Sequence, residues 1–457
     1  MFEKTKHVHM IGIGGIGMSA LAKWLHAEGV TVTGSDVHRS DITHDLERRG
    51  ITVVSGHAAD QVPETCDLVI CTPAILETNS ERVAAVQRGI RILTNFEFLG
   101  EISKSFSTIV VTGTNGKSTT TAMLGRILVE AGYDPTVLVG SMVPGFPDGN
   151  IRIGKGRFFV VEGCEYRANM MHFDPEMIVL TNIEEDHLDY YRNLEHIQET
   201  FQQFVNKLQG KGLAVYNAND AGTRPIKFAR AVAYGMDVRT DYEVRDRETS
   251  QGAQKVDVYR EEDGDVRLGP LELQVPGAFN VMNALAAIAA AMELGVPFET
   301  CRRTLKEFTG IWRRFERLGV WQGADLISDY GHHPSGIKGT LEAAREFFPG
   351  RRIVLCYEPH QHDRTKKLFN DLVETLRLAD HLVISEIYDV AGRNEEHDIS
   401  SRDLVQEIKK RDPAKDVQFA EDHDAAEALL RDLIKAQDVL IIMGAGDIDV
   451  LARKLQV

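Results

Sequence analysis

The sequence is poor in cysteine, in aromatic residues and in long apolar runs. Its 457 residues include five cysteines, three tryptophans and only 7% aromatic residues. No two cysteines form a C-x-x-C pair, so neither a zinc site nor a disulfide framework is indicated, and we expect a reducing, cytoplasmic environment. No apolar run approaches the ~18 residues of a membrane span, and the first residues lack the apolar core of a signal peptide.

Basic residues are also scarce relative to acidic ones. The chain has 52 Lys and Arg against 68 Asp and Glu, which gives a formal net charge of −16. This excess argues against general binding to nucleic acid or to an anionic membrane, and we predict neither as a partner. Binding of anionic small molecules stays possible, because nearby basic groups can outweigh the net charge within a Debye length of about 10 Å. The sequence does not indicate an oligomeric state.

What the sequence does contain is a regular alternation of short apolar strands with helical patterns. Such alternation predicts an α/β fold with parallel sheets covered by helices. The length suits about three domains of ~150 residues each, and polar joints near residues 100–107 and 310–319 divide the chain. A charged stretch, residues 241–268, is interpreted as a solvated hairpin rather than as core.

A glycine-rich turn with one lysine follows an apolar strand in "IVVTGTNGKSTTTAML", residues 109–124. Glycines let backbone N–H groups face phosphate oxygens, and the start of the next helix adds a partial positive charge. Lys117 could reach the terminal phosphates and the Ser118 hydroxyl could ligate Mg²⁺. The turn is shorter than the common P-loop, whose first glycine would stand at Val111. The alternative is a plain strand-to-helix turn, but the pattern favours binding of a nucleoside triphosphate.

Carboxylates stand at two nearby strand ends, where an open α/β sheet places its site. Mg²⁺ needs more oxygen ligands than one hydroxyl. The candidates lie in "VVEGCEY" and "TNIEEDHLDYY", and they are Glu162, Glu165, Glu184, Glu185, Asp186, His187 and Asp189. Glu162 directly follows the apolar run "RFFVV", as a second ligand beside a phosphate loop would. His187 is unusual among acids, and it could also be a surface histidine.

A second glycine pattern, "MIGIGGIGMSA", places Gly12, Gly14 and Gly17 in G-x-G-x-x-G spacing after a strand. Asp36 ends the next strand, about twenty residues on, as in a dinucleotide fingerprint. The pattern therefore supports an alternative, a nicotinamide-dependent dehydrogenase. A diphosphate-linked sugar nucleotide would fit the same turn. A dehydrogenase would leave the other phosphate loop unexplained.

Several segments together, in this order along nearly the whole chain, resemble one family. They are "GIGGIGMSALA" followed by "GSD", "TGTNGKSTT", "TNIEEDHLD", "PGAFNVMNALAAIA", "RRFE", "DYGHHP", "PHQHDRT" and "GAGD". They look like the Mur ligases, and "DYGHHP" and "GIGGIGMS" are most similar to the alanine-adding branch. The stretch after His187 has no lysine where other branches carry a carbamoylated one, which fits that branch.

The resemblance implies three domains. These are a Rossmann-like UDP-sugar-binding domain in residues 1–106, a central P-loop ATPase-like domain in 107–316, and a Rossmann-like, amino-acid-binding C-terminal domain in 317–457. It also implies an ATP- and Mg²⁺-dependent ligase of peptidoglycan precursor synthesis. That enzyme would phosphorylate the lactyl carboxylate of UDP-N-acetylmuramate and join L-alanine to it as an amide. A close alternative attaches a recycled murein tripeptide to the same sugar, and a non-catalytic nucleotide-binding regulator is a further one.

The resemblance also assigns roles to residues. The UDP-sugar would contact Gly14, Gly15, Ile16, Gly17, Ser35, Asp36, His38 and Arg39. ATP would contact Gly113, Thr114, Asn115, Gly116, Lys117, Ser118, Thr119, Asn280, Asn283, Arg314 and Asp329. Ser118 and Glu162 match ligands of a first Mg²⁺, and His187 matches a ligand of a second. The catalytic group would comprise Lys117, His187, His333, His360 and Arg364, with His332 beside it. For the lone histidines and for the pair Arg314 and Asp329, a structural or solvated surface role is the alternative.

The sequence departs from the family pattern at three informative positions. Asn115 replaces the usual histidine of the phosphate loop, Phe279 replaces a histidine before Asn280, and Gln361 replaces an arginine. The acidic segment is also altered, to "EGCEY". These changes bear on substrate affinity more than on the type of reaction.

Overall fold

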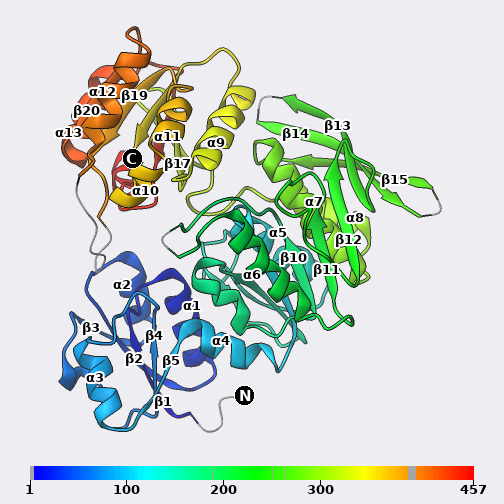
Figure 1. Ribbon diagram of the computed structural model, residues 1–457, viewed down its shortest axis with the longest axis vertical. Coiled ribbons are helices and arrows are strands. Elements are labelled where there is room, and N and C mark those ends of the chain that lie inside the picture. Colours follow the sequence, from blue (N-terminus) through cyan, green and yellow to red (C-terminus); the bar gives the residue numbers. More distant parts are fainter. Residues whose placement is uncertain (1–4, 189, 251, 263, 390–397, 457) are drawn as a thin grey trace. The chain divides into compact units, whose positions relative to one another are not determined.

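The computed structural model describes residues 5–188, 190–250, 252–262, 264–389 and 398–456 (Figure 1). The chain divides into two compact units. One comprises residues 1–245, 257–270 and 282–305, and the other comprises residues 246–256, 271–281 and 306–457. Three β-sheets flanked by helices make up the fold, so the predicted α/β class is confirmed.

The first sheet is parallel and has the strand order β3-β2-β1-β4-β5. Its strands are β1 (His7–Ile11), β2 (Thr31–Asp36), β3 (Thr52–Ser55), β4 (Leu68–Cys71) and β5 (Arg91–Thr94), and its helices are α1 (Ile16–Ala27), α2 (Asp41–Arg48), α3 (Ser80–Gln87) and α4 (Asn95–Ser103). The order reverses at β1, between β2 and β4. Ligands of doubly wound sheets bind at such a switch point, outside the carboxyl ends of the strands. The predicted Rossmann-like organisation is therefore present.

The second sheet has ten strands in the order β15-β14-β13-β12-β11-β10-β6-β9-β7-β8. Its strands are β6 (Ser107–Thr112), β7 (Thr136–Leu138), β8 (Ile151–Arg152), β9 (Phe158–Gly163), β10 (Met177–Leu180), β11 (Leu213–Asn217), β12 (Ala231–Met236), β13 (Tyr242–Ser250), β14 (Ala253–Glu261) and β15 (Asp265–Leu273). Its helices are α5 (Lys117–Glu130), α6 (Leu194–Asn206), α7 (Ala278–Glu293) and α8 (Phe298–Lys306). The strand β6 lies between β9 and β10 and is parallel to both, so the loops after these three strands meet at one edge.

The charged stretch 241–268 differs from its interpretation as a solvated hairpin. Its residues belong to three neighbouring strands, β13, β14 and β15, that continue the large sheet. Val244, Val256 and Val258 are at most 1% exposed, so one face of these strands is buried. Charged residues alternate with these valines, and the overall polarity of the stretch conceals the period of two that marks a half-buried strand.

The third sheet has the order β16-β17-β21-β18-β19-β20. Its strands are β16 (Glu316–Trp321), β17 (Ala324–Asp329), β18 (Ile353–Tyr357), β19 (His381–Ser385), β20 (Asp416–Ala420) and β21 (Val439–Met443). Its helices are α9 (Pro334–Phe347), α10 (His362–Lys367), α11 (Phe369–Leu376), α12 (Ser401–Arg411), α13 (His423–Leu433) and α14 (Asp449–Leu455). Only the edge pair of β16 and β17 is antiparallel among the strand pairs described for this sheet.

Within the first unit, aromatic packing joins the first sheet to the second. The ring of Trp24, on α1, lies 6.0 Å from that of Phe106 and 5.4 Å from that of Phe159. Buried Lys23 on the same helix donates to the Asp148 carbonyl oxygen at 2.9 Å and pairs with Asp45 at 3.0 Å. Aromatic contacts and buried, hydrogen-bonded charges of this kind hold two layers in one orientation.

The three sheets fall almost within the three predicted domains, since only β16 begins one residue early, at Glu316. The boundaries at 106/107 and 316/317 themselves stay a prediction. Among the described residues, no helix combines the length and the apolar character needed to cross a membrane.

Candidate active site

The phosphate loop connects β6 to α5 in the first unit, as predicted. It runs from Gly113 to Gly116, and α5 begins at Lys117. Gly116 has a φ of 82°, and a Cβ there would lie 2.3 Å from the side-chain oxygen of Asn283. Only glycine fits both the left-handed backbone and this close approach. The backbone of the loop therefore packs directly against the Asn283 side chain at the point where α5 begins.

Lys117 lies inside this loop and is almost enclosed. Its ammonium group donates to the carbonyl oxygens of Gly113 and Thr114, the latter at 2.9 Å, and pairs with Glu165 at 2.8 Å. Burial opposes the charged form of Lys117, but the negative charge of Glu165 outweighs it and raises the pKa of the lysine. For the same pair, burial favours neutral Glu165, but the charge of Lys117 prevails and lowers the pKa of the carboxyl. Lys117 is thus held as a cation at the loop.

Two sets of oxygen and nitrogen ligands face the loop. Ser118 donates its hydroxyl to Glu162 at 3.0 Å, which joins the start of α5 to the end of β9. Beside them, Glu165, Asp186 and His187 bring one ligand atom each to within 4.8 Å of one another. The ring of His187 also packs at 4.6 Å on that of Tyr166. Carboxylates, a hydroxyl and an imidazole beside a phosphate loop are suited to divalent cations.

The segment after β10 braces the phosphate loop. The carbonyl and side-chain oxygens of Asn182 accept from the N–H groups of Thr114 and Asn115, at 3.0 and 2.8 Å. The hydroxyl of Thr181 donates to the Asn115 carbonyl at 2.6 Å, and the N–H of Glu184 donates to the Thr114 hydroxyl at 2.9 Å. Asn115, which replaces the family's histidine, therefore contributes mainly backbone groups to this contact. Predicted Asp189 lies outside the described residues.

The two asparagines predicted to contact adenine differ in their surroundings. Asn283 accepts a hydrogen bond from the Thr120 hydroxyl at 3.3 Å and packs on Gly116. It therefore helps to shape the loop itself. Asn280 belongs to the second unit, where its side-chain amide donates to the Pro276 carbonyl at 2.7 Å. Contact of either side chain with a base stays a prediction.

The first glycine loop also has the predicted form. It follows β1, and α1 begins at Ile16 with Gly15 as its N-cap. Asp36 at the end of β2 accepts from the N–H of Gly14 at 2.8 Å and from that of His38 at 3.0 Å. Asp36 therefore orders the loop from the neighbouring strand. The remaining predicted contacts, Gly17, Ser35 and Arg39, differ in exposure: Ser35 is fully buried, whereas Arg39 is exposed and pairs with Glu47.

A buried polar network beneath this loop was not found from the sequence. Glu81 is fully buried and accepts from Ser35 at 2.8 Å, and its carboxylate lies 2.9 Å from His9 and 3.0 Å from His57. Burial alone would raise the pKa of Glu81, but the hydrogen bonds from His9 and Ser35 lower it. The four side chains come from residues far apart in the sequence, and no local motif marks them.

In the second unit, the predicted pair of Arg314 and Asp329 lies at the end of β17. Asp329 accepts from the N–H of Phe315 at 2.7 Å and from that of Gly331 at 2.8 Å. Burial raises the pKa of its carboxyl, and these bonds together with the charge of Arg314 counteract the effect in part. The guanidinium of Arg314 lies 4.8 Å from the ring centre of Tyr330. Asp329 is therefore buried in a packed turn, whereas Arg314 is exposed and lies over the ring of Tyr330.

The predicted histidines of the second unit divide into two groups. His332 and His360 have ring centres 6.1 Å apart, and Arg364 lies 3.3 Å from the Nδ1 of His360. Tyr388, which the sequence did not indicate, stacks on His360, with the ring centres 5.6 Å apart and an angle of 9° between the ring planes. His333 is the N-cap residue of α9, and its ring contacts the Ser335 hydroxyl at 2.9 Å. The histidine that packs with His360 is therefore His332, and not its neighbour His333, which the sequence predicted as the catalytic one of the two.

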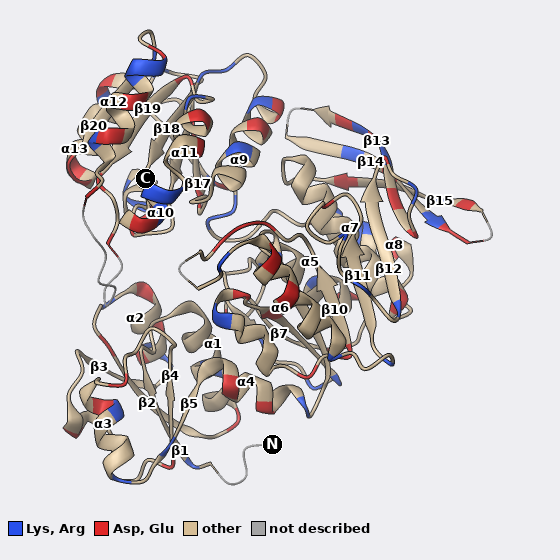
Figure 2. Ribbon diagram, in the orientation of Figure 1, with Lys and Arg blue, Asp and Glu red and all other residues tan. Residues whose placement is uncertain are grey.

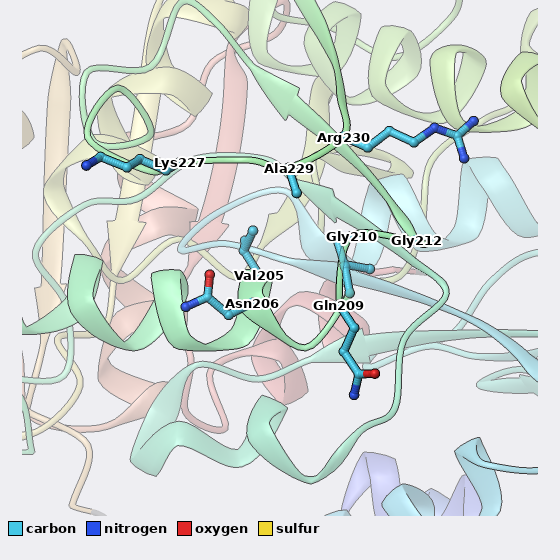
Figure 3. Close-up of a pocket in the computed structure, with 9 residues that line it drawn as sticks. Val205, Asn206, Gln209, Gly210, Gly212, Lys227, Ala229 and Arg230 are labelled. Carbon is cyan, nitrogen blue, oxygen red and sulfur yellow. The ribbon is translucent and has the colours of Figure 1, made fainter.

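A separate hollow of about 270 Å³ lies elsewhere in the first unit (Figure 3). Its lining comes from residues 205–212, before β11, and 227–230, before β12. These are the amino ends of parallel strands, whereas the phosphate loop follows the carboxyl end of β6. Figure 3 shows Lys227 and Arg230 extending away in opposite directions, so they do not converge on a ligand. This hollow is not part of the candidate active site.

Three family models match consecutive parts of the chain. They are "Mur ligase family, catalytic domain" over residues 7–107, "Mur ligase middle domain" over 111–291, and "Mur ligase, glutamate ligase domain" over 313–446. The order and extent of these matches follow the three sheets. These matches assign the region of the first glycine loop to the Mur ligases, and not to the nicotinamide-dependent dehydrogenases that the loop alone suggested.

Full-length relatives and solved structures agree with these matches. The chain is 38% identical over 451 residues to the UDP-N-acetylmuramate–L-alanine ligases of Caldanaerobacter subterraneus subsp. tengcongensis and Geobacter sp. strain M21, covering 98% of this chain and 96% of each relative. A crystal structure of UDP-N-acetylmuramate-alanine ligase from Thermotoga maritima superposes with a TM-score of 0.84 at 30% identity, covering 99% and 98% of the two chains. A crystal structure of a murein peptide ligase from Psychrobacter arcticus superposes with a TM-score of 0.75 at 25% sequence identity, covering 98% of each chain. The chain therefore belongs to the Mur ligase family of ATP-dependent ligases.

Proposed function

We propose that this protein joins L-alanine to the lactyl carboxylate of UDP-N-acetylmuramate, with conversion of ATP to ADP and phosphate, in peptidoglycan precursor synthesis. The observation that carries the proposal is that residues around one phosphate loop, Lys117, Ser118 and Glu162, have the chemistry of phosphoryl transfer. It is supported by full-length relatives of that name at 38% identity. Since ATP and a UDP-sugar are both cytoplasmic metabolites, we place the reaction in the cytoplasm.

The reaction has two steps whose atoms balance. The carboxylate oxygen attacks the γ-phosphorus of ATP, so that ADP leaves and an acyl phosphate forms. The amino nitrogen of alanine then attacks the carbonyl carbon, loses a proton, and expels phosphate as the amide bond forms. The first step is needed because a carboxylate is a poor electrophile, and the phosphoryl group provides the leaving group. Charge on the transferred group is the main barrier that the protein can lower.

In this scheme Lys117 exchanges its contacts with Glu165 and two loop carbonyls for contacts with the β- and γ-phosphates. The N–H groups of residues 113–119 and the start of α5 supply further positive potential. Because Lys117 is already held as a cation by its surroundings, binding of the triphosphate needs no change in its protonation. The loop is ordered by residues 181–184, so the site is organised in advance of ATP.

The residues present fit the magnesium that the family implies. Ser118 and Glu162 lie 3.0 Å apart and would hold one ion, whereas Glu165, Asp186 and His187 would hold a second. Mg²⁺ bound there would neutralise phosphate charge during transfer. Gly140 donates its N–H to Glu162, which keeps that carboxylate directed toward Ser118.

The sugar nucleotide is proposed to bind at the first glycine loop. The N–H groups of residues 14–17 at the start of α1 suit a diphosphate, and Asp36 keeps that loop in shape. His38 and Arg39 follow on the same edge, where they would meet the diphosphate. The amino acid is proposed to bind in the second unit, near His332, His360 and Arg364, since a guanidinium suits a carboxylate. His333 and the pair of Arg314 and Asp329 keep their predicted catalytic and ATP-binding roles as proposals.

An activity screen tests this function directly. Purified protein, ATP and Mg²⁺ are incubated with UDP-N-acetylmuramate and each amino acid or the murein tripeptide, and phosphate release and product mass are measured. We expect phosphate release to require both the sugar and L-alanine, with a product that contains one alanine. Release that responds to the tripeptide but not to alanine would indicate the recycling reaction instead. No release with any acceptor would support a non-catalytic regulator.

A further inference from the structure

In the second unit, three potential metal ligands meet away from the phosphate loop. Glu358 directly follows β18, Asp447 lies in the loop after β21, and His423 is the first residue of α13. One ligand atom of each lies within 4.8 Å of the others. The Nε2 of His423 is 3.1 Å from a carboxylate oxygen of Glu358 and 3.6 Å from one of Asp447.

We propose that Glu358, His423 and Asp447 form a binding site for a divalent transition-metal ion of the zinc class. Three protein ligands of one imidazole and two carboxylates, with a further position open, are a common donor set for such ions. A tetrahedral ion with bonds of about 2.0–2.1 Å separates its ligand atoms by roughly 3.3 Å. The observed separations of 3.1 and 3.6 Å bracket this value. The cluster beside the phosphate loop has the same three donor types, but ATP phosphates would complete the octahedral oxygen shell of Mg²⁺ there; without such oxygens, Mg²⁺ suits Glu358, His423 and Asp447 less well.

The charge of the cluster favours a cation. Among the described residues, the ion pairs of Glu358 and of Asp447 are made only with His423, and neither carboxylate has a lysine or arginine within 4.0 Å. Acidic residues also lie along α13 (Figure 2), where Asp424 and Glu427 both pair with Lys454. The side chain of Glu358 is only 4% exposed, so its charge is poorly solvated. A divalent ion with a neutral imidazole would balance the two carboxylates.

The backbone around the cluster holds its members in place. The N–H of Glu358 donates to the Met443 carbonyl at 2.9 Å, and the N–H of Ile448 reaches the Glu358 side chain at 3.4 Å. A Cβ on Gly446 would lie 2.2 Å from a Glu358 oxygen, so only glycine allows the loop to approach so closely. Buried Arg313 donates to the Gly446 carbonyl at 3.0 Å and fixes the same loop. Glu358 and the loop that carries Asp447 therefore belong to an ordered framework, whereas the Asp447 side chain itself is 60% exposed.

The same contacts could also be explained by a protonated His423 that bridges the two carboxylates without any metal. Measuring metal binding distinguishes this ion pair from the proposed metal site. Full-length protein stripped with chelator is titrated with Zn²⁺ by calorimetry and with Co²⁺ by visible absorption, in millimolar Mg²⁺. The variants are His423→Ala and Glu358→Gln. The matched control is His381→Ala, which removes another histidine that pairs with a carboxylate, Asp416 at 2.9 Å, on the same sheet.

We expect the wild-type protein and His381→Ala to share one Zn²⁺ site that both cluster variants lose or bind about 100-fold more weakly. The Co²⁺ absorption of that site should disappear with it. Unchanged stoichiometry and affinity in Glu358→Gln and His423→Ala would overturn the proposal and leave a structural ion pair. If His423→Ala fails to fold by circular dichroism, Glu358→Gln decides alone, because it keeps the shape of the side chain. Since the readout is metal binding, the outcome is independent of the proposed ligase activity.

Discussion

The first unit contains two glycine loops that are built alike and are equipped differently. Each follows a strand that lies between two parallel neighbours and leads into a helix, α1 in one case and α5 in the other. The loop before α5 contains Lys117 and faces Glu162 and Glu165. Among the residues that the structure describes, no set of metal ligands was found to face the loop before α1, which also has no lysine, and Asp36 accepts from its backbone instead.

This difference separates holding a phosphate from transferring one. Backbone N–H groups at a helix start are sufficient to bind a diphosphate. Transfer also requires groups that neutralise charge as it moves, and Lys117 with its neighbouring carboxylates can provide them directly and through metal ions. Under the proposed function, the same local fold would serve two roles, and the side chains around it would decide which role each loop has. Substitutions at four positions test this comparison.

The largest effect is expected at the lysine of the second loop. Lys117→Ala should lower kcat by about 1,000-fold or more, because the developing phosphate charge loses its fixed cation. Circular dichroism should show an intact fold. Phosphate release in the complete reaction measures the effect, with exposed Lys155→Ala as the control that stays at wild-type rate. Undiminished release in Lys117→Ala would contradict the role of this loop in transfer.

A large effect on stability is expected when Glu81, in the buried polar network beneath the first glycine loop, is replaced. Glu81→Gln should lower the free energy of unfolding by about 2–4 kcal/mol, because it breaks a buried charged network around His9 and His57. Denaturant titration measures it, with exposed Glu77→Gln as the control. The pKa of Glu81 is lowered in the folded state from its ordinary value of 4.5. The carboxylate therefore stabilises the fold above pH 4.5, and this contribution is lost as the pH falls through the lowered pKa.

The difference between wild type and Glu81→Gln should consequently be full at neutral pH and should narrow in acid. A difference that stayed constant, or grew, below pH 4.5 would show that the ionised carboxylate is not what stabilises this region.

A smaller effect, on binding alone, is expected at the first loop. Asp36→Ala should weaken the sugar nucleotide about 10–100-fold, since a charged acceptor of the Gly14 N–H is worth roughly 1.5–3 kcal/mol. Calorimetry should find the affinity for an ATP analogue unchanged, and exposed Asp60→Ala should match the wild type for both ligands. An equal loss of both affinities would mean that the two loops do not bind separate ligands.

The smallest effect is expected from Ser118→Thr. Ser118→Thr keeps the hydroxyl that faces Glu162 and should change kcat by about threefold or less, the added methyl being the only perturbation. Ser118→Ala, which removes the hydroxyl, should reduce kcat much more. If both variants lose activity to the same extent, steric fit at this position matters and the hydroxyl does not.

Much of the fold followed from local pattern. The alternation of apolar strands and helices predicted the parallel sheets, and the glycine and lysine pattern located the turn before α5. The strands β13 to β15 were harder, because charged residues on one face masked buried Val244 and Val258 on the other. The antiparallel pair of β16 and β17 was also missed, since an edge strand that adds to a parallel sheet has no helix between it and its neighbour.

The site was predictable where chemistry is local in sequence and unpredictable where it is not. Gly113 to Ser118 form one continuous motif, whereas the contact of Glu81 with His9 and His57 depends on three separate elements. Tyr388 stacks on His360 only because β18 and β19 are neighbours in the sheet. Such contacts depend on strand order, which a single sequence does not state.

The most direct measurement of the central claim follows oxygen atoms. UDP-N-acetylmuramate labelled with ¹⁸O in its lactyl carboxylate is converted with ATP and L-alanine, and the released phosphate is analysed by ³¹P NMR. If the carboxylate takes the phosphoryl group and the amine then displaces it, each phosphate carries one ¹⁸O atom from the sugar. Unlabelled phosphate would show that ATP hydrolysis does not pass through the carboxylate, and it would contradict the account of the site around Lys117.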